Sequence, residues 1–177
     1  MVRLIKTNRV VSIFKLRCIM TSNSAVCYTY ESALDMAISM EERCYREYLN
    51  TLLLVKDKAA KSLLKDAAIE ASEHKHKLEV ALLEGSVQHL QLMQKEVPIM
   101  QLDKLLKQEN LHADATSREA LAYIIHMKKK SIDFYDQLVA NCEGAPMAPI
   151  YKQLRTRVRS QMQQAEDLYE KHFLTEN

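Results

Sequence analysis

The sequence of 177 residues contains only two glycines, three prolines and no tryptophan. An all-β domain needs a turn roughly every ten residues and normally uses many more glycines and prolines. The chain also lacks any run of about 18 apolar residues, so no membrane-spanning segment is predicted. Because 47% of its residues are hydrophobic, these absences predict one domain of long helices with few connections.

Neither sign of charge dominates, since 25 basic residues stand against 23 acidic ones and the net charge is +2. This balance gives no reason to expect a nucleic-acid partner. Residues 1–19 hold five basic residues and no acidic one. We interpret residues 1–28 as a basic tail, or as sequence upstream of a start at Met20, because Lys15 and Arg17 interrupt the apolar stretch that a secretory signal needs. The bundle is expected over residues 29–175.

The cysteines are scattered along the chain, and no two of them form a C-x-x-C pair. Zinc ribbons, rubredoxin-type iron sites and thioredoxin-type redox pairs all depend on such pairs. Their absence is therefore predicted, and a reducing cytoplasm is the expected location. The four residues are Cys18, Cys27, Cys44 and Cys142.

Apolar residues recur at three-to-four spacing in four stretches, which predicts helices over about 30–55, 58–84, 117–141 and 148–173. Gly85 follows the second stretch, where glycine commonly ends a helix, and Thr116 and Glu119 form a capping-box pattern before the third. Within the long connection at 86–116, residues 99–111 are expected to form a short amphipathic helix. Short, long and short connections are typical of a four-helix bundle whose middle link crosses from one end to the other.

The two halves of the chain match each other when one is shifted by 87 residues without a gap. One fixed offset that serves both pairs of helices is hard to obtain from amphipathic periodicity alone. The sequence therefore predicts a helical hairpin that occurs twice. Matching positions include Leu34 with Leu121, Ile38 with Ile125, Tyr48 with Tyr135 and Ala67 with Leu154.

The first predicted helix contains the motif Ala-Leu-x-x-Ala-Ile-x-Met-Glu-Glu-x-x-Tyr-x-x-Tyr, from Ala33 to Tyr48. With two hairpins and a crossover, this motif resembles the rubrerythrin branch of the ferritin-like superfamily, over residues 30–173. The resemblance implies an all-α, ferritin-like four-helix bundle made of two repeated hairpins. It also implies six ligands for two irons that react with peroxide or oxygen: from each hairpin, one carboxylate on its first helix and a Glu-x-x-His pair on its second.

Most of these implied ligands are missing. Glu41 matches the first carboxylate and His74 the first histidine, but their repeat mates are Lys128 and Gln161. Glu70, one turn before His74, is a possible substitute carboxylate. Glu41, Glu70 and His74 are therefore at most a weak site for one iron or manganese ion.

A rival register uses the literal Glu-x-x-His formed by Glu73 and His76, which share a helix face because they are three residues apart. His74 lies near the centre of the apolar stripe, whereas Glu73 and His76 lie well away from it. We therefore favour His74 as the inward residue and keep Glu73 and His76 as the alternative.

We expect Lys128 to replace a metal as the direct counter-ion of Glu41, with Gln161 hydrogen-bonded in the same cluster. Two alternatives without a functional role stay open. In one, Lys128 extends outward into water; in the other, His74 is an ordinary core histidine. The predicted function is a bundle with no catalytic residues and no cofactor beyond a possible single metal. The alternative is a diiron peroxidase with an external electron donor. A homodimer is expected, without nucleic-acid or membrane partners.

Overall fold

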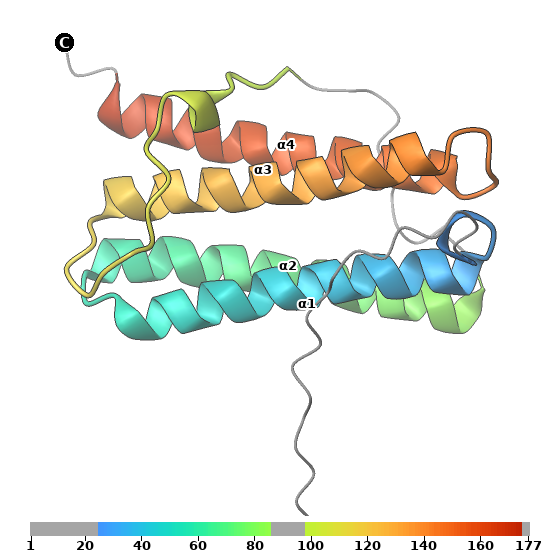
Figure 1. Cartoon of the computed structure of the whole chain (residues 1–177). Coiled ribbons are helices and arrows are strands. Elements are labelled where there is room, and N and C mark those ends of the chain that lie inside the picture. Colours follow the sequence, from blue (N-terminus) through green and yellow to red (C-terminus); the bar gives the residue numbers. More distant parts are fainter. Residues whose placement is uncertain (1–24, 86–97, 175–177) are drawn as a thin grey trace, which may run out of the picture.

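The computed structural model describes residues 25–85 and 98–174, and within them it contains four α-helices and no strand (Figure 1). The predicted helix ranges are confirmed to within one residue. The α-helices are α1 (Tyr30–Leu54), α2 (Lys58–Glu84), α3 (Ser117–Asn141) and α4 (Ala148–Phe173), and two short 3-10 helices are η1 (Ala25–Cys27) and η3 (Leu102–Lys104).

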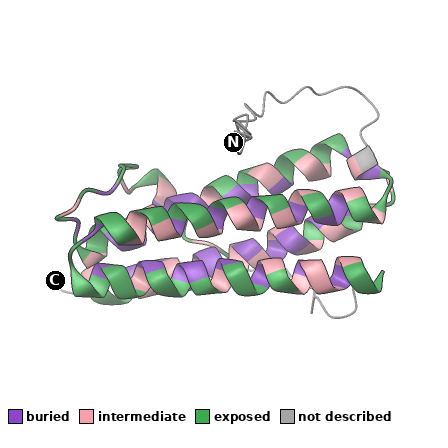
Figure 2. Ribbon diagram, turned by 90° about the horizontal axis from the view of Figure 1, so that it is seen from below, coloured by how far each residue is buried: buried purple, intermediate pink, exposed green. Residues whose placement is uncertain are grey.

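The four helices lie roughly parallel to one common axis and form a bundle. The helix α1 packs along α2, and α3 packs along α4, each pair joined by a short loop. The end of α2 and the start of α3 lie at opposite ends of the bundle (Figure 1), so the connection between them runs its length. The helix faces that point inward carry the buried residues (Figure 2).

Local capping fixes where the helices begin and end. Asp57 caps α2, because its Oδ1 accepts a hydrogen bond of 2.7 Å from the backbone of Ala60. Gly85 ends α2 in the left-handed region, at φ 63°, which confirms its predicted role. The capping box of Thr116 and Glu119 at the start of α3 is also confirmed.

We expect Thr116→Ala to lower the free energy of unfolding by about 1 kcal/mol, the usual cost of a lost N-cap.

The backbone N–H and the hydroxyl of Thr116 hold the pKa of the Glu119 carboxyl below its usual value. The folded-state pKa is thus the lower one, so the stability that Glu119 contributes is present above the unfolded pKa and is lost as pH falls through the folded pKa. Urea unfolding of Glu119→Gln at neutral and acidic pH should show a deficit that shrinks in acid, with Ser117→Ala as a near-neutral control.

The described part of the crossover, residues 98–116, is here called the strap. It contains only η3, so the predicted helix over 99–111 is wrong. The cause is Glu166 of α4, whose carboxylate accepts backbone N–H bonds from Met100 at 2.7 Å and Leu102 at 2.8 Å. Both amides point at one carboxylate because Gln101 between them is left-handed, at φ 60°, which no continuous α-helix permits.

Two further contacts hold the rest of the strap. The Nε2 of His126 on α3 donates to the backbone oxygen of Leu106 at 3.0 Å. The backbone N–H of Lys56, between α1 and α2, donates to the oxygen of Ala113 at 2.8 Å. The strap is thus attached to α4, α3 and the α1–α2 loop in turn.

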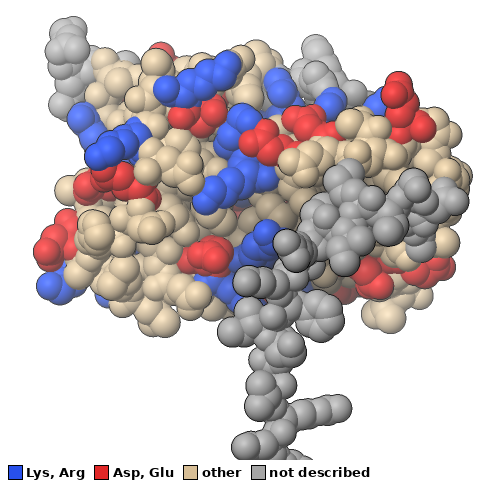
Figure 3. All heavy atoms as spheres, in the orientation of Figure 1, with Lys and Arg blue, Asp and Glu red and all other residues tan. Residues whose placement is uncertain are grey.

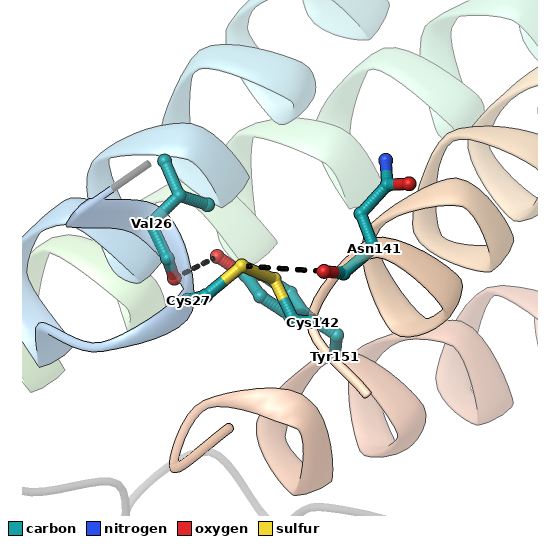
Figure 4. Close-up of a disulfide and its surroundings, with 5 residues drawn as sticks. All are labelled: Val26, Cys27, Asn141, Cys142 and Tyr151. Carbon is teal, nitrogen blue, oxygen red and sulfur yellow. Dashed lines mark hydrogen bonds between the residues drawn. A yellow bond between two sulfur atoms is a disulfide. The ribbon is translucent and has the colours of Figure 1, made fainter. Parts of the chain in front are cut away.

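The residues before α1 are also attached to the bundle. A disulfide joins Cys27 of η1 to Cys142 at the end of α3, with 5.1 Å between the Cα atoms (Figure 4). The Tyr151 hydroxyl donates to the backbone oxygen of Val26 at 2.9 Å. The backbone N–H of Met147 donates to the backbone oxygen of Cys27 at 3.2 Å. Residues 25–28, assigned to the tail from sequence, therefore belong to the packed structure. Residues 1–24 of that tail lie outside the described part.

Charged side chains of both signs are interspersed over the face that Figure 3 presents, without a large area of one sign. Among the described helices, none combines the length and the apolarity needed to cross a membrane.

Candidate functional site

The five residues of the predicted polar cluster come together in the interior. Glu41 comes from α1, Glu70 and His74 from α2, Lys128 from α3 and Gln161 from α4, so every helix contributes. His74 is 6% exposed and Lys128 is 7% exposed. Hydrogen bonds and one ion pair link each of these side chains to the next, in the order Glu70, Lys128, Gln161, His74 and Glu41. We call these five residues the core cluster.

Lys128 points inward, so the outward alternative is wrong. Its Nζ donates to Glu70 Oε2 at 2.6 Å and to Gln161 Oε1 at 3.0 Å. The Glu70 side chain is 35% exposed and the Lys128 side chain 8%. The direct counter-ion of the buried ammonium is therefore Glu70, whose carboxylate also reaches solvent.

The predicted direct pair of Lys128 with Glu41 is wrong, because Glu41 is bonded to His74 instead, with 3.4 Å between Oε1 and Nδ1. Gln161 bridges the gap: its Oε1 accepts from Lys128, and its Nε2 lies 3.1 Å from His74 Nε2. With the proton of His74 on Nδ1, donors run in one direction from Lys128 through Gln161 and His74 to Glu41. The sequence indicated the right residues but the wrong carboxylate.

Two contacts of this region join residues that are 87 positions apart. They are the bond between Gln161 and His74 and the 3.4 Å contact between Cys44 Sγ and Ser131 Oγ. The helices α1 and α3 also share this offset, because Tyr30 precedes Ser117, and Leu54 precedes Asn141, by 87 residues. Burial raises the pKa of the Cys44 thiol.

The rival pair lies away from the core cluster. Glu73 and His76 are both exposed on α2. Glu73 lines a surface pocket between α2 and α4, and Glu73 and His76 together line another between α1 and α2. The structure therefore favours His74 over His76 as the interior histidine.

The residues present do not fit a pair of metal ions. No group of three or more His, Cys, Asp or Glu side chains within residues 25–85 and 98–174 is arranged to hold a metal, and this includes Glu41, Glu70 and His74. An ammonium group has no lone pair to offer a cation, and Lys128 places one against Glu70. The donor set expected from the resemblance is thus incomplete, and a cation occupies part of it.

Two further residues lie near the core cluster, and one of them, Arg157, was not found from the sequence. Arg157 on α4 is half-buried; burial lowers the pKa of its guanidinium, and the carboxylates of Glu41, Glu70 and Glu73 oppose this shift. Tyr135 is fully buried, which raises the pKa of its hydroxyl well above the usual value. The apolar spacing of the third predicted helix already placed Tyr135 inward, whereas no sequence signal marked Arg157.

A small cavity of about 10 Å³ lies beside Glu41, His74, Tyr135 and Arg157, one from each helix. This is roughly the space that one water molecule needs. Leu78, Leu154 and Val158 also line it, so the interior next to Glu41 is closely packed and only partly polar.

Comparison of the chain with protein-family models, with curated proteins and with solved structures finds no match. The geometry of the core cluster is therefore the basis for any functional conclusion.

Proposed function

We propose that this chain is a ferritin-like bundle that serves a binding or structural role without two-metal redox chemistry. Its interior charge is balanced by its own side chains in place of metal ions. The observation that carries the proposal is the buried ammonium of Lys128, in contact with the carboxylate of Glu70 and the amide oxygen of Gln161.

Charge and donor chemistry support this proposal. A buried carboxylate is strongly destabilising unless a cation or several hydrogen bonds compensate it. Glu70 has Lys128, and Glu41 has His74 at the end of the donor chain. A divalent ion placed among these groups would have to displace or deprotonate the ammonium of Lys128, which costs free energy that an all-carboxylate site would not require.

The shared offset of 87 residues supports the ferritin-like part of the proposal. If the two hairpins are repeats related by an internal twofold axis, repeat mates meet where they approach that axis. His74 with Gln161 and Cys44 with Ser131 are two such meetings of mates. Glu41 and Lys128 are mates by the same offset, so Lys128 stands where the resemblance implies a second carboxylate.

The test is the metal content of Lys128→Glu compared with that of the unaltered chain. Both proteins are purified from cells grown with iron and manganese and analysed by mass spectrometry for metal per chain. We expect well below one metal per chain for the natural sequence. Lys128→Glu gains bound metal, because it replaces the cation with a carboxylate beside Glu41, Glu70 and His74.

The matched control is Lys130→Glu, which makes the same charge change at an exposed position of α3. It should leave the metal content unchanged. Two metal ions per chain in the natural protein would overturn the proposal and favour a diiron oxidoreductase that receives electrons from a separate donor. Light scattering on the same samples tests the proposed homodimer.

A further inference from the structure

A groove runs along the surface between α2 and α4, above the core cluster. It consists of two adjoining pockets of about 420 and 350 Å³. The two share four lining residues, so they form one continuous depression. Those four are Glu70, Glu73, Gln161 and Gln164. Ligand sites in proteins commonly have volumes of about 300–1,000 Å³.

One half of the groove is largely apolar. Its floor comes from α3, where Leu121 and Ile124 lie, and its walls come from Leu63 on α2 and Leu168 on α4. Ile69, at the edge of this half, is 45% exposed. Leu121 and Ile124 are already buried, so a hydrocarbon chain placed here would mainly remove the exposed surface of Leu63, Ile69 and Leu168 from water, which is favourable.

The other half is lined only by polar side chains. These offer hydrogen-bond donors, such as Ser160 and Gln164, and acceptors, such as Glu73, around a space open to solvent. Lys128 lies where the halves meet, and its ammonium has three N–H donors, of which Glu70 and Gln161 take two. Within residues 25–85 and 98–174 the third has no further acceptor, and we assign it to a ligand oxygen.

The charges that line the groove nearly cancel. Around the polar half, where the head group would lie, Glu70 and Glu73 provide two carboxylates and Lys128 and Arg157 two cations, whereas Asp66 lines the apolar half. A fully charged head group would disturb this balance, and an anion would meet the exposed carboxylate of Glu73. An uncharged head with several hydroxyl groups can use both donors and acceptors at no electrostatic cost.

From the adjoining apolar and polar halves we propose that the groove binds a neutral amphiphile, a molecule with one hydrocarbon tail and an uncharged, hydroxyl-rich head. The tail lies over Leu121, Ile124 and Leu168. The head lies in the polar half, where Lys128 donates to one of its oxygens. This inference stands on the groove alone and does not require the proposed absence of metal.

The experiment compares three probes with the same eight-carbon tail: octyl glucoside, octanoate and octylammonium. Each is titrated into the full chain below the concentration at which it self-associates, and binding is followed by calorimetry and by NMR chemical shifts. We expect octyl glucoside to bind most tightly, with shifts at residues of the groove. Tighter binding of octanoate or octylammonium would overturn the neutral head group, and no binding of any probe would overturn the site.

Ala165→Trp locates the binding, because Ala165 lines the apolar half and a large ring there fills the path of the tail. It should weaken binding of octyl glucoside by about tenfold or more, a loss of about 1.4 kcal/mol or more. The matched control is Ala140→Trp, at an exposed position of α3 outside the groove. Circular dichroism checks that both variants fold, and equal affinity in the two would place the ligand elsewhere and overturn the proposal.

Discussion

Reduction of the bond between Cys27 and Cys142 is expected to lower the free energy of unfolding by about 4 kcal/mol. The two cysteines are 115 residues apart. A cross-link of that span restricts the unfolded chain strongly, and the chain-entropy model assigns a loop of this length a stabilisation at the upper end of the usual range. No other single change proposed for this protein has a larger expected effect.

Urea unfolding with and without dithiothreitol measures this effect. Cys142→Ser provides the control, since it should unfold at the same urea concentration with or without the reductant. Cys44→Ser should keep the full response, because Cys44 is the free cysteine of the described region and is buried beside Ser131. An unchanged unfolding curve for the natural chain, together with a full count of free thiols, would contradict the disulfide.

The disulfide also bears on the compartment. Disulfides persist in oxidising environments and are rare in the cytosol. The scattered cysteines led to the expectation of a reducing cytoplasm, and that location stays a prediction. Alkylation of thiols at the moment of cell lysis decides whether the pair is oxidised where the protein resides.

Glu166→Ala is expected to lower the free energy of unfolding by about 3 kcal/mol, because hydrogen bonds to a charged group are worth roughly 1.5–3 kcal/mol each and two donors lose their partner. Glu166 is 0% exposed, and its two oxygens hold the backbone of Met100 and Leu102. Glu166→Gln should also lower the free energy of unfolding, but by less than Glu166→Ala. The amide keeps one acceptor oxygen, whereas its N–H₂ group faces the other backbone donor.

Chemical unfolding and hydrogen exchange together test the role of Glu166. The amide of Leu102 should exchange faster in Glu166→Ala, because it loses its acceptor. Glu170→Ala, one turn further along α4 and exposed, is the matched control and should change neither measurement. If Glu166→Ala unfolds like the natural protein, the strap is not held by this carboxylate.

The helices could be predicted from the sequence because their determinants are local. Amphipathic spacing marks the inward faces, and Gly85 and the box of Thr116 and Glu119 mark ends. The same spacing placed His74 near the centre of the inward stripe. For this reason the members of the core cluster were predictable although their pairing was not.

The partner of Lys128 could not be predicted from the sequence, because it depends on how far side chains extend from one helix toward another. Glu41 and Glu70 both project toward the interior, and the choice between them depends on the distances between side-chain ends, which spacing along one helix does not report. The helix predicted within the strap was wrong for a related reason. Residues 99–111 have helical periodicity, but a carboxylate that is distant in sequence, Glu166, takes the backbone amides at their start. The pairing of Cys27 with Cys142 is equally non-local.

The covalent ring that the cystine closes has a consequence for how the bundle comes apart. The ring contains α1, α2 and α3, and of the described α-helices only α4 lies outside it. Under oxidising conditions α4 can therefore separate from the other three helices while the disulfide stays formed. Because α4 supplies both Gln161 and Glu166, its departure would strip the buried lysine of its amide partner and release the start of the strap in one event.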